Sequence, residues 1–107
     1  MSSADHYLAD VLKSLAQPTR LKIIDFLRAG ERCVCEIFPA IDEEQSNTSR
    51  HLSYMQTHGI LSRRKDGVKI YYAVKHPEVF EIIDRAACIV KREIEFRSGL
   101  IKEAVRG

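Results

Sequence analysis

The hydrophobic repeat of this chain changes twice, and these changes restrict the fold more than any other feature. Up to Gly59 the apolar residues recur every three or four positions, which is the period of an amphipathic helix. Between residues 60 and 74 they alternate with polar residues, as in a strand, and from Pro77 onward the helical period returns. An Asp66-Gly67 pair divides the alternating segment. The pattern therefore predicts a mainly α-helical protein with one β-hairpin, closed by a two-residue Asp-Gly turn.

The length and composition fit one small domain. With 107 residues, of which 45% are hydrophobic, the chain can build one core, so residues 1–107 are predicted to form a single domain. No apolar run approaches the roughly 20 residues that span a bilayer, and the N-terminus lacks the pattern of a signal peptide. Three cysteines, an odd number, fit a reducing compartment. We therefore expect a cytoplasmic protein without membrane contact.

The predicted order of elements is α-α-α-α-β-β-α. Helices are expected at residues 4–15, 18–29, 33–41, 44–59 and 77–103, with the hairpin at residues 60–74. Pro18 should open the second helix and Gly30 should end it, because proline suits the first turn of a helix and glycine the position after the last. Pro39 should end the helical part of the third segment near Phe38. The apolar residues expected on the buried side of the second helix are Leu21, Ile23, Ile24, Phe26 and Leu27.

The fourth helix, residues 44–59, has an unusual outer face. Thr48, Leu52 and Met55 form its inner stripe, while the opposite face carries short polar side chains around Arg50. Such a face can approach another surface closely, and Ser, Asn, Gln and Arg are side chains that contact base edges and phosphates in the DNA major groove. The alternative is an ordinary polar helix face. The candidate DNA contacts on this helix are Gln45, Ser46, Asn47, Ser49, Arg50, His51 and Ser53.

Positive charge gathers on this helix and on the hairpin that follows it. Residues 31–44 hold five acidic side chains against one basic, whereas residues 45–75 hold six basic against one acidic. A basic hairpin directly after a helix-turn-helix is placed as a wing, which contacts the phosphate backbone beside the groove. The alternative is a soluble hairpin whose lysines prevent edge pairing. The candidate phosphate contacts are Arg63, Arg64, Lys65 and Lys69.

The last helix has an apolar surface that is wide for a domain of this size. Its main stripe is Val79, Ile83, Ala86, Val90 and Ile94, with Ile82, Ile89, Phe96 and Leu100 on a second flank. We interpret this surface as covering its own subunit on one flank and a second copy on the other, with help from the first helix. A two-fold homodimer would present two reading helices to an inverted-repeat operator. The alternative is a monomer whose terminal helix wraps the core.

Two segments carry a resemblance to a known family. They are Glu31-Arg32-Cys33-Val34-Cys35-Glu36-Ile37 and Gln45-Ser46-Asn47-Thr48-Ser49-Arg50-His51-Leu52. Together with the order of elements and a wing running from Arg64 through Gly67 to Tyr71 and Tyr72, they resemble the ArsR/SmtB family of metal- and metalloid-sensing repressors, from about Leu12 to Ile94. The resemblance implies a homodimeric winged helix-turn-helix repressor, not an enzyme, that binds operator DNA and releases it when an ion or thiol reagent occupies a site elsewhere.

The resemblance also places Cys33-Val34-Cys35 where metalloid-binding members of the family carry a Cys-Val-Cys box. Thiolate sulfur is the soft ligand that arsenite, antimonite, cadmium or lead prefers. Residues two apart on a regular helix point about 200° apart, so both sulfurs can reach one ion only if the segment is distorted. An occupied site would then strain the helix-turn-helix and lower its DNA affinity. The candidate metal ligands are Cys33, Cys35 and Cys88, and no obligatory cofactor is expected.

Other interpretations of these residues remain open. The same repressor could sense redox state, with Cys33 and Cys35, or one of them with Cys88, forming a disulfide. One or both of the first two cysteines could instead be small buried hydrophobic residues. His6 could complete the site across a dimer. The zinc site of other members looks absent, because Ile89 and Arg92 stand where its later ligands would be expected, after His76 and Glu78. A winged-helix module for protein contacts, without an inducer, is a further alternative.

Overall fold

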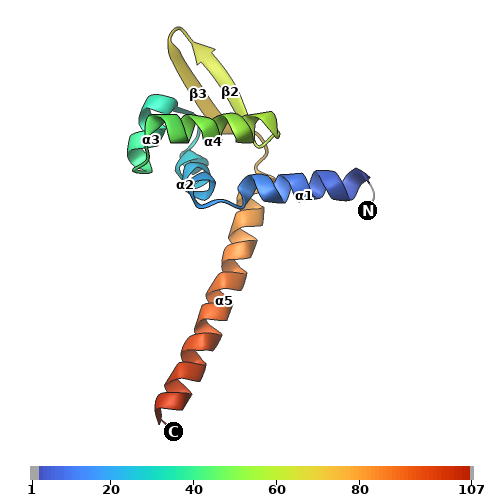
Figure 1. The fold of residues 1–107 in the computed structure, drawn as a ribbon, viewed down its shortest axis with the longest axis vertical. Helices are drawn as coiled ribbons and strands as arrows, with labels where there is room; N and C mark the ends of the chain where they lie inside the picture. Colours follow the sequence, from blue (N-terminus) through green and yellow to red (C-terminus); the bar gives the residue numbers. More distant parts are fainter. Residues whose placement is uncertain (1–2, 107) are drawn as a thin grey trace. The chain divides into compact units, whose positions relative to one another are not determined.

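The computed structural model describes residues 3–106 and confirms the predicted class, mainly α-helical with a hairpin wing (Figure 1). The chain divides into two compact units, Met1–Pro77 and Glu78–Gly107. Whether both belong to the single domain predicted from the sequence stays a prediction. The elements of the first unit are α1 (Ser3–Leu15), α2 (Pro18–Phe26), η1 (Leu27–Ala29), β1 (Arg32–Cys33), α3 (Val34–Ala40), α4 (Gln45–Thr57), β2 (Leu61–Asp66) and β3 (Lys69–Val74), and the second unit is α5 (Glu78–Arg106).

The core of the first unit lies where α2, α3 and α4 meet. The inner stripe predicted for α4 is confirmed, because Thr48, Leu52 and Met55 are all fully buried. Burial of Leu52 and of Met55 stabilises the fold by about 1.5–3 kcal/mol each. Among the described residues of the first unit, the other large side chains that are buried are Leu15, Ile23, Ile24, Leu27, Ile37, Ile41, Ile60, Leu61 and Tyr72.

The ends of α2 and α4 follow from their sequences. Gln17 caps α2, its side chain accepting a hydrogen bond from the backbone N–H of Arg20 at 3.1 Å, and Pro18 takes the first helical position as predicted. Gly59 follows α4 with φ +79°, the left-handed conformation expected of a helix stop. One expectation is wrong: Leu21 is 42% exposed, and Thr19 is the buried residue in the first turn of α2.

Pro39 does not end α3, contrary to the prediction, since the helix continues to Ala40. Proline lacks one N–H donor, but its ring holds φ near the helical value. The carbonyl groups around it remain available as acceptors. The backbone N–H of Ile41 donates to Ile37 at 3.1 Å and that of Asp42 donates to Pro39 at 3.2 Å, so the last turn closes around the proline.

The sheet contains one strand more than predicted. Its order is β1-β3-β2, all antiparallel, and β1 pairs Cys33 with Tyr71 of β3. A strand of two residues is too short to produce an alternating pattern, so periodicity could not predict it. The predicted turn is also shifted by one residue. Asp66 pairs with Lys69, which leaves Gly67 (φ +62°) and Val68 as the turn, because glycine favours the first central position of such a turn.

The second unit is the single helix α5, which runs three residues beyond its predicted end. Several of its large apolar side chains are exposed: Ile82, Ile89, Val90, Ile94, Phe96, Leu100, Ile101 and Val105. In the first unit, α1 likewise exposes Tyr7, Leu8 and Leu12. None of the helices within residues 3–106 is long and apolar enough to cross a membrane.

Candidate nucleic-acid interface and thiol site

The outer face of α4 carries the polar row that the sequence predicted. Gln45, Ser46, Arg50 and Ser53 are exposed, whereas Asn47, Ser49 and His51 are half-buried. Because the side chains around Arg50 are short, another surface can approach the helix backbone closely here. This geometry suits hydrogen bonding to the edges of bases.

The guanidinium group of Arg50 is held in place by Asn47 and, through Asn47, by Glu43. It donates a hydrogen bond to Asn47 Oδ1 at 2.6 Å, and Asn47 Nδ2 donates to Glu43 Oε2 at 3.3 Å. Glu43 is fixed in turn by α2, since Thr19 Oγ1 donates to Glu43 Oε1 at 3.3 Å and Lys22 Nζ lies 3.5 Å from the same oxygen. The acidic turn before α4 therefore links Arg50 to α2. The sequence showed that this turn is acidic, but nothing in it indicated that Glu43 links Arg50 to α2.

Arg20 is a second residue that reasoning from the sequence missed. Its Nε donates a hydrogen bond to His51 Nδ1 at 3.2 Å, and its guanidinium lies 3.8 Å from the centroid of the Tyr54 ring. Burial lowers the pKa of His51, and the charges of Arg20 and Arg50 lower it further, against a smaller opposing effect of Glu43. His51, a predicted DNA contact, thus directs one ring nitrogen into the protein. Nothing in the sequence of α2 distinguishes Arg20 from the other charged residues of this helix.

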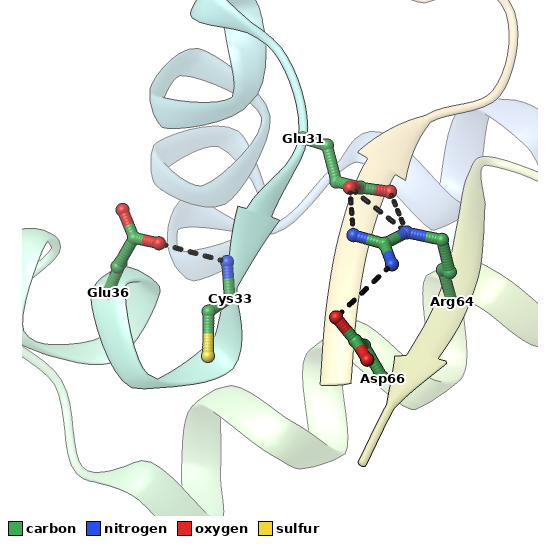
Figure 2. Close-up of polar contacts among 5 residues, drawn as sticks. All are labelled: Glu31, Cys33, Glu36, Arg64 and Asp66. Atoms are coloured by element: carbon green, nitrogen blue, oxygen red, sulfur yellow. Dashed lines mark hydrogen bonds and ion pairs between the residues drawn. The ribbon is translucent and has the colours of Figure 1, made fainter. Parts of the chain in front are cut away.

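The hairpin presents its basic side chains unequally. Arg63, Arg64, Lys65 and Lys69 are all exposed, but Arg64 alone of these forms a bidentate pair with Glu31, with Nη2 at 2.7 Å from Oε1 and Nε at 3.1 Å from Oε2 (Figure 2). Arg64 also lies 3.9 Å from Asp66. The hydrogen bond between Glu31 and Arg64 lowers the pKa of Glu31 and raises that of Arg64. Arg64 is therefore less free to contact phosphate than the other basic residues of the hairpin.

Cys33 and Cys35 lie at the start of α3, and their sulfur atoms are paired in a disulfide. Cys33 is the N-cap of the helix, in an extended conformation (φ −70°, ψ 145°), so only Cys35 has helical geometry. The conflict expected for two cysteines on one regular helix therefore does not arise. Cys33 is 3% exposed, and its backbone N–H donates to Glu36 Oε1 at 3.4 Å (Figure 2), whereas Cys35 is exposed.

The cysteine pair and the predicted DNA contacts line one groove. It has a volume of about 400 Å³ and lies between the start of α3, the outer face of α4 and the hairpin. The predicted site residues that it brings together are Cys33, Cys35, Gln45, Ser49, Ser53, Arg63 and Lys69. The two sulfur atoms therefore lie beside residues that the sequence predicted to contact DNA.

The remaining predicted ligands are placed differently. Cys88 is exposed on α5, with Arg85, Lys91 and Arg92 on the same helix, and belongs to the second unit. His6 is exposed on α1. Among the residues that the structure describes, no three His, Cys, Asp or Glu side chains form a group that could hold a metal ion.

A helix-turn-helix with a polar second helix, followed by a basic hairpin, defines a winged helix-turn-helix protein. Comparison with known proteins gives the family. The profile of "Bacterial regulatory protein, arsR family" matches residues 17–63, and the arsenical resistance operon repressor of Staphylococcus aureus is 33% identical over 71% of this chain and 73% of its own length. The chain belongs to the ArsR family of bacterial transcription regulators. The family and the regulatory, non-enzymatic class predicted from the sequence are confirmed.

Two further proteins are similar to this chain. A probable mercury resistance operon repressor of Streptomyces lividans is 37% identical over 76% of the chain, and the match spans 65% of that protein, just under two thirds. The solution structure of a homodimeric winged helix-turn-helix DNA-binding domain from Mycobacterium bovis, a possible ArsR-family regulator, has a TM-score of 0.75 at 26% identity. The superposed residues cover 89% of this chain and 92% of that domain. The winged-helix architecture is therefore shared with a solved structure.

The pair of Glu31 and Arg64 gives a testable titration. Replacing Arg64 with Gln should raise the pKa of Glu31 toward that of an ordinary carboxyl group, because the hydrogen bond that lowers it is removed. With Arg64 present, the interaction is complete above the usual carboxyl pKa and is lost as pH falls through the lowered value. NMR titration of the side-chain carboxyl measures this directly. The Arg63→Gln variant removes a neighbouring charge and should leave Glu31 unchanged, whereas equal effects of the two variants would contradict the assignment.

Proposed function

We propose that the protein is a transcriptional repressor that binds operator DNA as a homodimer, with α4 in the major groove and the β2–β3 hairpin along the phosphate backbone. The observation that carries this proposal is the support of Arg50. Its guanidinium is exposed, yet Asn47 and Glu43 hold it from the protein side. An arginine positioned in advance can donate two hydrogen bonds to guanine with less loss of side-chain entropy. Such a regulator acts in the cytoplasm, where the chromosome lies.

A two-fold dimer is supported separately in the two units. The apolar side chains exposed on α5, such as Ile89 and Phe96, are more than 60% accessible in the single chain. In the first unit, Leu8 and Leu12 of α1 are exposed as well. Large apolar patches of this kind mark association surfaces, and the similar domain from Mycobacterium bovis is homodimeric. A two-fold pair of α4 helices fits an inverted-repeat operator.

Binding of the protein's own upstream DNA tests the role assigned to Arg50. Arg50→Ala should weaken binding to that DNA by about 1–3 kcal/mol and relax the choice of sequence, while binding to random DNA changes much less. Lys65→Ala is the matched comparison on the hairpin, where Lys65 is exposed. It should weaken both complexes alike and lower the salt dependence by about one counterion. Small, equal effects of both variants in a gel-shift titration would remove the assignment of roles.

We further propose that a thiophilic metal or metalloid, such as arsenite, antimonite or cadmium, releases the repressor by binding Cys33 and Cys35. Their place in the groove beside Ser49, Ser53 and Arg63 supports this, because an occupant there lies at the DNA-facing surface. The names of the similar mercury and arsenical resistance repressors point to the same class of inducer. Soft ions of this kind bind thiolates, so only the reduced pair could hold one.

Redox sensing through the same two residues is the second candidate. The observation that favours it is the disulfide between Cys33 and Cys35. In the disulfide neither sulfur is a thiolate, so oxidation and ion binding exclude one another at this site. The chemical state of one pair of thiols therefore separates the two candidates.

A gel shift on the upstream DNA distinguishes the inducers. If the site senses ions, arsenite or cadmium should release the reduced protein, and Cys33→Ser or Cys35→Ser should abolish this response. Cys88→Ser, which removes the exposed thiol of α5, is the control and should respond like the wild type. If the site senses redox state, an oxidant alone should change DNA affinity and the ions should not. A response to every reagent that survives both substitutions would exclude the pair as the sensor.

A further inference from the structure

Arg20 joins three helices of the first unit. It lies on α2, and its Nε donates a hydrogen bond to His51 Nδ1 on α4 at 3.2 Å. Its Nη1 donates to the carbonyl oxygen of Lys13, in the last turn of α1, at 3.2 Å. The same guanidinium covers the Tyr54 ring at 3.8 Å, and Tyr54 stacks on His58 with the ring centroids 4.1 Å apart. One side chain thus makes directional contacts with two successive turns of α4.

We propose that Arg20 is a positioning residue for DNA recognition, fixing the rotation of α4 about its own axis and so the direction in which Arg50 points. This inference rests on the proposed function. The inner stripe of α4 is narrow, and packing of apolar side chains is not directional. A planar guanidinium that stacks on Tyr54 while donating to His51 has fixed geometry. Because His51 follows Arg50 directly in the sequence, a rotation that broke the contact with Arg20 would also redirect Arg50.

The contact requires His51 to be neutral, since Nδ1 accepts the hydrogen bond and the proton must then lie on Nε2. The charged groups that face this imidazole are Arg20 from α2, Arg50 from its own helix and Glu43 from the preceding turn. Burial and the two arginines together lower the pKa of His51, which favours the neutral ring. Protonation would remove the acceptor and place a cation against the guanidinium. The contact is therefore present above the lowered pKa and lost as pH falls through it.

Acid should consequently separate specific from non-specific binding. A protonated His51 adds positive charge, which by itself strengthens binding to any DNA. If Arg20 positions α4, affinity for the upstream DNA should nevertheless fall as His51 protonates, while affinity for random DNA holds or rises. A parallel change in both would show that the imidazole contributes only charge.

Variants of Arg20 test the positioning role. Arg20→Gln should lower affinity for the upstream DNA about tenfold or more, the scale of one lost bidentate contact. Affinity for random DNA should fall only as far as it does in Arg28→Gln, the control, which removes an equal charge from an arginine that pairs with Asp25 at 2.9 Å. Arg20→Lys keeps the charge but cannot both stack and donate, so it should lose specific affinity too. Equal losses in Arg20→Gln and Arg28→Gln, or a wild-type Arg20→Lys, would overturn the proposal.

An NMR titration of His51 in the free protein completes the test without DNA. The pKa of His51 should rise in Arg20→Gln and stay unchanged in Arg28→Gln. If Arg20→Gln does not fold, Arg20→Lys replaces it in this comparison and tests the hydrogen bond to His51 Nδ1. An identical titration of His51 in wild type and variant would overturn the contact itself. Failure of the wild type to bind its upstream DNA, with the His51 shift observed, would instead remove the proposed function and with it the role in recognition.

Discussion

The packing of α4 against α2 is the contact on which the rest of this structure depends. Thr48, Leu52 and Met55 are fully buried on the inner side of α4, together with Ile23 and Ile24 of α2. This packing leaves the polar face of α4 outward and, because the hairpin begins two residues after Gly59, also sets where the wing starts. Packing of the inner face of α4 therefore determines which of its side chains face outward.

Polar contacts refine what the apolar stripe sets in place. Glu43 and Asn47 connect Arg50 to α2, and Arg20 of α2 holds His51. The cysteine pair lies in a groove with Gln45, Ser49 and Ser53 of α4, and β1 pairs Cys33 with β3. A change in the chemistry of the thiols thus occurs within the same surface as the groups proposed to contact DNA, so no long pathway between them is required.

Periodicity predicted the helices, the hairpin and the buried stripe of α4, because these depend on repeated local choices of apolar residue. It could not predict β1, where two residues pair with a strand far along the chain, nor the shift of the turn to Gly67 and Val68. Residue type alone indicated Arg64 as a phosphate contact, but its pairing with Glu31 depends on tertiary structure. The roles of Arg20 and Glu43 were missed for the same reason: each contacts residues that only the fold brings near.

Backbone amide chemical shifts, recorded by NMR as the protein's own upstream duplex is added, show which residues contact DNA. The largest shifts are predicted on the outer face of α4, around Ser46, Ser49, Arg50 and Ser53, and on the β2–β3 hairpin. Shifts confined to α5 or to the exposed side of α2, with the outer face of α4 unchanged, would contradict this prediction.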